Sequence, residues 1–147
     1  MNPTACSYNP LHPYLIIKNC AEAIDFYMKA FGASERERMT QPDGRIGHAE
    51  IQIGDSVVMV ADEYPEIGAF SPEHYGGSPV SLHVYVEDCD AAYRRAIAAG
   101  AKTVRDPQDQ PYGDRNAGVL DPFGYKWWMA SPTKTKDLVE SAIGERV

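Results

Sequence analysis

One segment decides the fold of this chain, Ile17-Lys-Asn-Cys-Ala-Glu-Ala-Ile-Asp-Phe-Tyr-Met-Lys-Ala-Phe-Gly-Ala33, because it is written twice. It returns, one residue shorter, as Val86-Glu-Asp-Cys-Asp-Ala-Ala-Tyr-Arg-Arg-Ala-Ile-Ala-Ala-Gly-Ala101. The two copies are about 69 residues apart, which is typical of a duplicated structural unit. Duplicated units joined about a pseudo-twofold axis create a shared cleft, so we expect positions one period apart to face each other across it.

Each copy predicts the same order of elements: a strand, a helix and then three strands. In the first copy, apolar residues recur at helical spacing over residues 21–31, and Gly32 ends that helix. Residues 46–53 alternate strictly between apolar and polar side chains and predict a strand. Between the copies, residues 65–79 are rich in Gly, Pro and Ser and predict a linker without regular structure.

These elements predict an α+β fold of two tandem βαβββ modules. We expect a curved mixed sheet around a central cleft, with the helices on the outside. The modules span residues 12–64 and 80–131 of one domain, with residues 65–79 as the linker. Residues 132–147 form a tail, for which a short terminal helix and a frayed end are alternatives.

Composition excludes several classes of partner. The chain has 14 basic and 21 acidic residues and no visible basic patch, so we expect no binding to nucleic acid. No apolar stretch approaches the roughly 18 residues of a transmembrane helix, which argues against a membrane protein. No secretory signal pattern opens the sequence, and the three cysteines contain no CxxC pair. We therefore expect a cytoplasmic location.

Alternation within the strands separates an apolar face from a polar face, because residues two apart in a strand share a face. The apolar side chains must meet the helices, so the opposite face is expected to be open to water or to a ligand. The side chains expected on this second face are His12, Tyr14, Ile16, His48, Glu50, Gln52, Ser81, His83 and Tyr85.

Several spaced motifs resemble those of the vicinal oxygen chelate superfamily, which includes glyoxalase I, extradiol dioxygenases and the bleomycin and fosfomycin resistance proteins. The motifs are Ala23-Ile-Asp-Phe-Tyr27, Ala30-Phe-Gly-Ala33 and Asp121-Pro-Phe-Gly124. The resemblance narrows to the PhnB-like branch at Gly47-His-Ala-Glu50, Ser81-Leu-His-Val-Tyr-Val-Glu-Asp88 and Asp109-Gln-Pro-Tyr-Gly-Asp-Arg115. It runs from about His12 to Ala130 and implies a homodimer, either side by side or with swapped modules.

The resemblance also locates the metal ligands of metal-dependent relatives, in which each module gives one ligand from its first strand and one from its last. Those positions are His12, Met59, Ser81 and Trp128 here. Only His12 is a suitable ligand, because a thioether is soft, a hydroxyl binds poorly and an indole is a donor only. The resemblance therefore implies that the usual four-ligand metal site is dismantled.

A displaced metal site is the alternative. His48 and Glu50 share a face two residues apart, and His83 or His12 is a candidate third ligand for a divalent zinc, nickel, manganese or iron ion. The same two residues also fit a hydrogen-bonded pair that shapes the cleft floor. In a third interpretation, Glu50 is the catalytic acid or base.

Further side chains are expected to line the cleft. Trp128 either stacks on a flat ligand or fills the space left by the lost metal site, whereas Trp127 should be core. Arg115 either pairs with Asp114 on the surface or clamps an anionic ligand. The residues predicted to contact a ligand are Tyr14, Gln52, Met59, Ser81, Tyr85, Tyr112, Arg115 and Trp128.

Two functions follow from these residues. The first is binding of a small organic molecule in the cleft between the two modules, without the usual four-ligand metal site and with no cofactor assigned, similar to the bleomycin-binding proteins. The alternative is a metal-dependent lyase, isomerase or dioxygenase that acts on a small oxygenated substrate. The sequence contains no GxSxG, GxxxxGK[ST] or GxGxxG motif, so we expect no chemistry of those classes.

Overall fold

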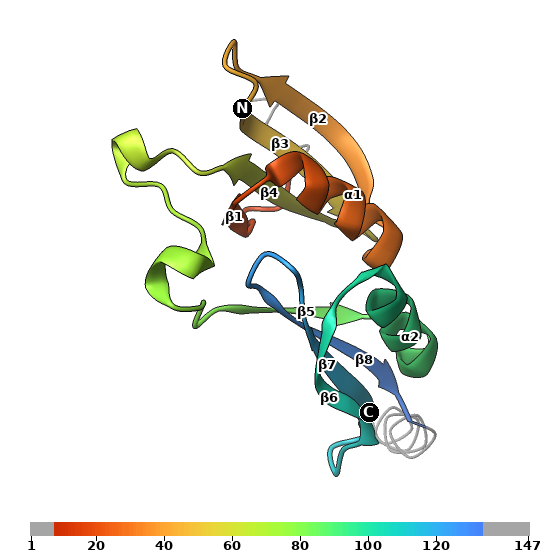
Figure 1. The fold of residues 1–147 in the computed structure, drawn as a ribbon. Coiled ribbons are helices and arrows are strands. Elements are labelled where there is room, and N and C mark those ends of the chain that lie inside the picture. The colour runs from red at the N-terminus through yellow and green to blue at the C-terminus, as the bar shows by residue number, and fades with distance from the viewer. Residues whose placement is uncertain (1–7, 134–147) are drawn as a thin grey trace. The chain divides into compact units, whose positions relative to one another are not determined.

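The computed structural model describes residues 8–133. The chain divides into two compact units, with the boundary between Gly77 and Ser78. Among the described residues, each unit holds one α-helix and one four-stranded sheet (Figure 1). The α+β prediction with two tandem βαβββ modules is confirmed. The strands form two sheets, one in each module. Within residues 8–133, neither helix has the length and apolarity needed to cross a membrane. The tail was predicted over residues 132–147, of which residues 134–147 lie outside the described part of the chain.

The first module contains one helix and a mixed sheet. Its elements are β1 (Tyr14–Ile17), α1 (Cys20–Phe31), β2 (Ser34–Thr40), β3 (Ile46–Ile53) and β4 (Ser56–Asp62). The strand order is β1-β4-β3-β2, with β1 parallel to β4 and the other pairs antiparallel. The parallel pair sits at one edge because the chain crosses over through α1 between its first two strands.

The second module repeats this arrangement. Its elements are β5 (Ser81–Tyr85), α2 (Cys89–Ala99), β6 (Lys102–Asp109), β7 (Asp114–Leu120) and β8 (Lys126–Pro132). The strand order is β5-β8-β7-β6, again with a parallel edge pair. The duplication in the sequence therefore corresponds to a duplication of topology.

The predicted linker is more regular than expected. It contains two 3-10 helices, η2 (Pro65–Ile67) and η3 (Pro72–Tyr75). The prediction of no regular structure there was wrong because both prolines begin a helix. Proline has a suitable φ at the first helical position and loses no hydrogen bond there.

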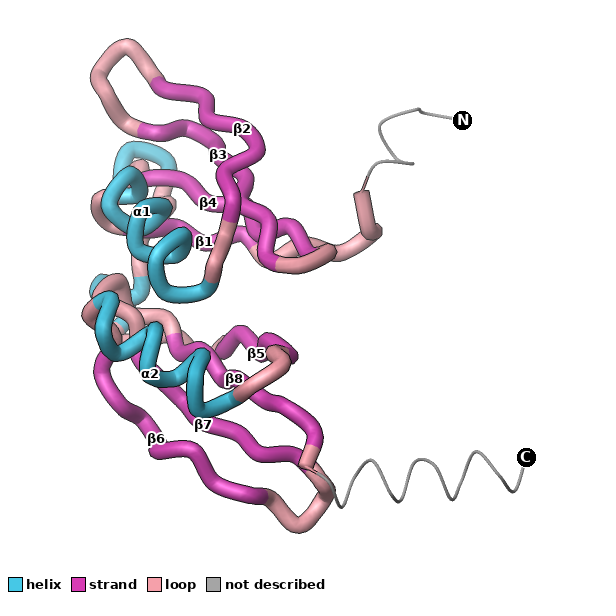
Figure 2. The backbone as a smooth tube through the Cα atoms, turned by 90° about the vertical axis from the view of Figure 1, so that its right-hand side faces the viewer, coloured by secondary structure: helices cyan, strands magenta, loops and turns pink. Residues whose placement is uncertain are grey.

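Helix α1 covers one face of the first sheet (Figure 2). Its stripe of Ala23, Ile24 and Tyr27 is fully buried, and so are Ala49 and Val60 on the facing strands. Because side chains alternate along a strand, the neighbours of these buried strand residues point to the opposite face. That second face carries the polar residues of the candidate site.

Both helices begin in the same way. The Cys20 N–H donates to Asp62 Oδ1 at 2.8 Å, and the Cys89 N–H donates to Ser131 Oγ at 3.1 Å. In each module, the last strand therefore satisfies the first amide of the helix. Both cysteines are buried free thiols, and burial raises the pKa of Cys20 to about 12 and that of Cys89 to about 11. This burial indicates that both cysteines have a packing role.

Candidate functional site

A row of side chains crosses the free face of the first sheet. The register places Tyr14 beside Met59, Met59 beside Glu50 and Glu50 beside Glu37. His48 lies two residues before Glu50 and shares its face. We call the surface formed by Tyr14, Glu37, His48, Glu50 and Met59 the open face of the first module. It brings together four of the residues that the sequence predicted for the site.

A hydrogen-bond chain crosses the open face and is centred on Glu50. Glu50 is only 4% exposed, and its side chain accepts a hydrogen bond from the Tyr8 hydroxyl, with 3.2 Å between that oxygen and Glu50 Oε1. His48 Nε2 lies 3.1 Å from Glu50 Oε2, and Tyr14 Oη lies 2.7 Å from His48 Nδ1. The structure thus contains the hydrogen-bonded His48–Glu50 pair, which was one of the alternatives.

The two phenols decide the direction of the hydrogen bonds across the open face. The hydrogen bond to Glu50 raises the pKa of Tyr8, and burial raises the pKa of Tyr14. Both phenols therefore keep their protons at neutral pH and act as donors. When Tyr14 donates to His48 Nδ1, the remaining Nε2–H donates to the Glu50 carboxylate. In this arrangement Tyr14 donates to His48, and His48 donates to Glu50.

Glu37 joins this group from the edge strand β2. One ligand atom each from Glu37, His48 and Glu50 lies within 4.8 Å of the others. Two carboxylates and one imidazole are suitable ligands for zinc, manganese or iron. The sequence did not predict Glu37, because β2 pairs with β3 through a bulge between Glu35 and Glu37 that its loose alternation does not reveal.

The four positions implied by the family resemblance do not fit a metal centre. The His12 Nδ1–H donates to the Val57 carbonyl at 3.0 Å, so that imidazole has one nitrogen left. The Met59 thioether lies beside Tyr14 and Glu50, and Ser81 begins β5 beside Lys126. Trp128 offers no lone pair to a metal ion. This donor set cannot hold a divalent ion.

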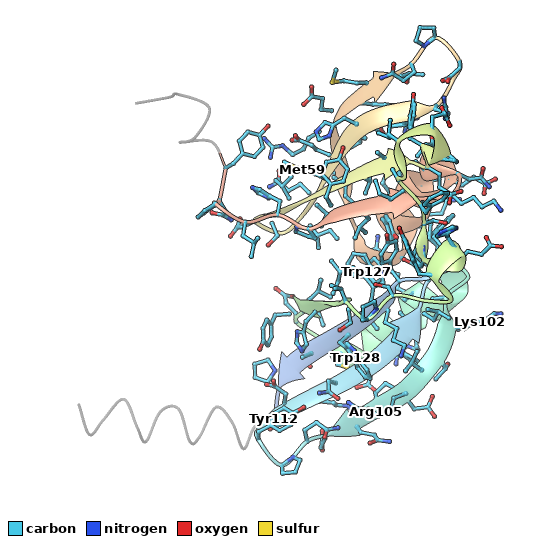
Figure 3. All side chains as sticks on the ribbon, turned by 90° about the vertical axis from the view of Figure 1, so that its left-hand side faces the viewer. Met59, Lys102, Arg105, Tyr112, Trp127 and Trp128 are labelled. Atoms are coloured by element: carbon cyan, nitrogen blue, oxygen red, sulfur yellow. The ribbon has the colours of Figure 1, made fainter. Side chains whose placement is uncertain are left out.

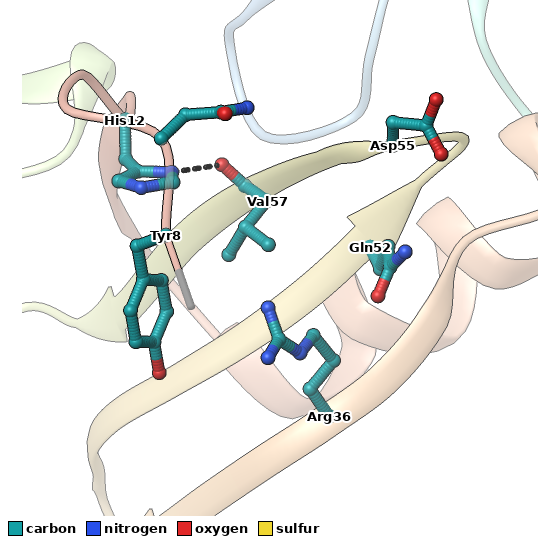
Figure 4. Close-up of a pocket in the computed structure, with 7 residues that line it drawn as sticks. Tyr8, His12, Arg36, Gln52, Asp55 and Val57 are labelled. Carbon is teal, nitrogen blue, oxygen red and sulfur yellow. Dashed lines mark hydrogen bonds between the residues drawn. The ribbon is translucent and has the colours of Figure 1, made fainter. Parts of the chain in front are cut away.

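A pocket of about 250 Å³ lies in the first module (Figure 4). It is lined by Tyr8, Asn9, His12, Arg36, Gln52, Asp55 and Val57. Two of these, His12 and Gln52, were predicted site residues. Tyr8, which links the pocket to Glu50, was not predicted because it precedes the first strand and belongs to no alternating pattern.

The second module carries a different row at the corresponding strand positions. His83 lies beside Trp128, Trp128 beside Gly118 and Gly118 beside Arg105. The Arg105 guanidinium carbon lies 4.9 Å from the centroid of the Trp128 ring (Figure 3). Glycine and arginine thus occupy the places where the first module has Glu50 and Glu37. Trp127 is buried as predicted.

The other predicted residues of this module have separate surroundings. Arg115 donates to Asp90 at 2.7 and 3.0 Å and to Asp109 at 3.2 Å. Arg115 therefore forms surface ion pairs, as one of the alternatives expected, and its partners here are Asp90 and Asp109. The Arg115 guanidinium lowers the pKa of Asp90.

Tyr112 belongs to a second chain of polar contacts. Its hydroxyl accepts a hydrogen bond from Asn116 Nδ2 at 2.8 Å, and Asn116 Oδ1 accepts one from Arg105. The sequence did not predict Arg105 or Asn116 as site residues. Ser81, His83 and Tyr85 are exposed along β5. Contact of these residues with a ligand, and the cleft shared by the two modules, stay predictions.

Within residues 8–133, each βαβββ module has a helix on one face of its sheet and no helix on the other, and the two tandem modules place the chain among two-module α+β proteins. More particularly, the chain belongs to the Glyoxalase/Bleomycin resistance protein/Dioxygenase superfamily, whose family model matches residues 9–129. The resemblance inferred from the sequence is therefore confirmed. Membership of this superfamily establishes the fold, but one fold supports many functions, so the chemistry has to be inferred from the site residues.

Similar proteins agree with this family. An uncharacterized protein from Mycobacterium bovis is 41% identical over 133 residues, which cover 88% of each chain. The crystal structure of TioX from Micromonospora is 29% identical, with a TM-score of 0.65 over 85% of this chain and 97% of TioX. A PhnB protein from Bacillus cereus shares the fold, with 17% identity and a TM-score of 0.65 over 84% of this chain and 99% of that protein.

Proposed function

We propose that the protein binds a small organic molecule on the open face of the first module, without the four-ligand metal site of metal-dependent relatives. One observation carries this proposal: a pocket of about 250 Å³ is lined by Tyr8, whose hydroxyl donates a hydrogen bond to the buried Glu50. Binding pockets combine a concave surface with a few positioned polar groups, and these residues provide both features. The unsuitable donors at the family's metal positions support binding that does not depend on a metal ion.

Saturation-transfer NMR with a fragment library tests this proposal in the presence of EDTA. Bound fragments should lose affinity by about tenfold in Val57→Ala, because that substitution removes apolar contact area from the pocket. Val58→Ala is the matched control, since Val58 is the next residue of β4 and lies beside Ile51 on the helix-covered face. The proposal fails if the library yields no binder, or if both variants reduce affinity equally.

A divalent metal ion is the second candidate ligand, and the arrangement of Glu37, His48 and Glu50 favours it. A bound ion would supply Lewis-acid chemistry to an oxygenated substrate. The chain's own contribution would be two carboxylates and an imidazole, which would have to give up the His48–Glu50 hydrogen bond. Tyr14 would then orient His48 through Nδ1.

Metal analysis of protein purified without chelators separates the two candidates. Stoichiometric metal that disappears in Glu37→Gln would support the metal site and overturn the metal-independent proposal. Glu35→Gln is the matched control, because Glu35 pairs with Arg38 and with the helix-side residue Ile51. Metal content that is negligible, or equal in both variants, rules out this metal site.

A further inference from the structure

We propose that the pocket lined by Tyr8, His12, Arg36 and Gln52 takes a small monocarboxylate that also carries a hydroxyl group. This inference rests on the proposed binding function and names the chemical class of its ligand. Arg36 binds the carboxylate, and His12 accepts a hydrogen bond from the hydroxyl.

A β-bulge directs Arg36 to this pocket. Glu35 pairs with Ile51 and Glu37 pairs with Glu50, so Arg36 is the additional residue in β2. In a regular strand, adjacent side chains point to opposite faces. Here Arg36 lines the pocket, and Glu37 belongs to the group with His48 and Glu50 on the same face. Bulges reorient side chains in this way and are common beside functional sites.

The charge of Arg36 has no acidic partner among residues 8–133. Its contact is with the Tyr8 ring, whose centroid lies 5.3 Å from the guanidinium carbon. By contrast, Arg38 on the same strand pairs with Glu35, and Arg45 pairs with Asp43 and Glu66. The planar guanidinium can donate two parallel hydrogen bonds, which is the geometry that a carboxylate accepts.

His12 provides the second feature of the pocket. A carbonyl oxygen can only accept a hydrogen bond, so the contact with Val57 fixes the proton on His12 Nδ1. The other nitrogen, Nε2, is buried and has no partner within the described residues. In the neutral ring, Nε2 is an acceptor that a ligand hydroxyl can satisfy. Buried polar atoms are normally hydrogen-bonded, so this exception indicates a ligand group.

The remaining polar groups restrict the charge of the ligand. The amide nitrogen of Gln52 donates to the Gly54 carbonyl at 2.9 Å, which leaves its oxygen as a further acceptor. The Asp55 carboxylate also lines the pocket. A doubly charged anion would meet more repulsion there than a single carboxylate. These groups therefore favour a monocarboxylate over a phosphate dianion.

Three small probes test the two interactions separately on the full chain. Lactate has both the carboxylate and the hydroxyl, lactamide lacks the charge, and propionate lacks the hydroxyl. NMR titrations should show lactate binding roughly fivefold more tightly than lactamide, the effect of one partly exposed ion pair. A similar factor of about five should separate lactate from propionate, the effect of one hydrogen bond.

Two variants assign these preferences to residues. Arg36→Gln should abolish the difference between lactate and lactamide, and His12→Phe should abolish the difference between lactate and propionate. Arg38→Gln is the matched control, since it removes the same charge from the other face of β2, where Arg38 lies beside the buried Ala49. Thermal melts establish that each variant is folded.

The inference is overturned if lactate and lactamide bind equally, if no probe binds, or if Arg36→Gln and Arg38→Gln have the same effect. Preference for phosphate over lactate would also overturn it. These failures remain distinct from failure of the proposed function. If neutral fragments bind the open face with the same affinity in Arg36→Gln, the proposed function stands while this inference fails. If fragments of every charge fail to bind, the proposed function fails as well.

Discussion

Gly118 should be required in the second module because the Trp128 ring occupies the space where a side chain would be. A Cβ atom at position 118 would lie 2.5 Å from Trp128 Cζ3 and 2.8 Å from Cε3. Both distances are shorter than real Cβ contacts. The contacted atoms belong to one rigid ring, so Gly118→Ala must displace the whole indole from its position beside Arg105.

The size of the effect follows from two opposing terms. Overpacking of this kind costs about 1–3 kcal/mol of stability. Where the backbone permits it, replacing glycine by alanine stabilises a protein by about 0.4–1 kcal/mol, because it lowers the conformational entropy of the unfolded chain. Gly118 is not among the residues with positive φ, so the second term applies. We expect a net loss of about 1–2 kcal/mol, which lowers Tm by roughly 2–8 °C for a protein of this size.

Thermal denaturation measures the loss, and tryptophan fluorescence measures the movement of the ring. Trp127 is only 1% exposed, so a red shift in emission should come from Trp128. A double-mutant cycle supplies the control. In a Trp128→Leu background the ring is absent, and Gly118→Ala should cost less than about 0.5 kcal/mol. An equal loss in both backgrounds would refute the reasoning.

Three further predictions concern the first module. Burial raises the pKa of the Cys20 thiol to about 12, so its ionisation favours the unfolded chain at high pH. The free energy of unfolding, measured by urea denaturation, should therefore fall as the pH rises from about 9 to 12. Cys20→Ala should weaken this pH dependence, and an unchanged pH dependence in the variant would contradict the prediction. Asp62→Ala removes the acceptor for the Cys20 and Ile46 amides. It should lower the free energy of unfolding by about 1–2 kcal/mol in urea denaturation, and a loss under about 0.5 kcal/mol would contradict this prediction. Glu50→Gln should change stability by less than about 1 kcal/mol, because relief of desolvation offsets weaker hydrogen bonds. A loss above about 3 kcal/mol in thermal melts would instead make Glu50 a structural residue.

The repeated segment predicted the fold because duplication and hydrophobic periodicity are visible in sequence. The helix expected over residues 21–31 corresponds to α1, and the strictly alternating strand matches β3. Alternation also placed His48 and Glu50 on one face, where the structure joins them by a hydrogen bond. These successes depend on local patterns within single elements.

Features that depend on contacts between elements were not predictable in the same way. The bulge that brings Arg36 and Glu37 to one face depends on the register between β2 and β3. The partners of Arg115 depend on how α2 packs against its sheet. Single-strand alternation contains neither kind of information. Homodimerisation and a cytoplasmic location stay predictions.

NMR of protein labelled at its methionine methyl groups tests the central claim most directly. Met59 lies on the open face, whereas Met28 lies on α1 and Met129 is buried in the second module. Titration with the tightest-binding fragment should shift the Met59 signal strongly and leave Met28 and Met129 unchanged. A saturable shift at Met129 or Met28, with Met59 unaffected, would contradict a binding site on the open face of the first module.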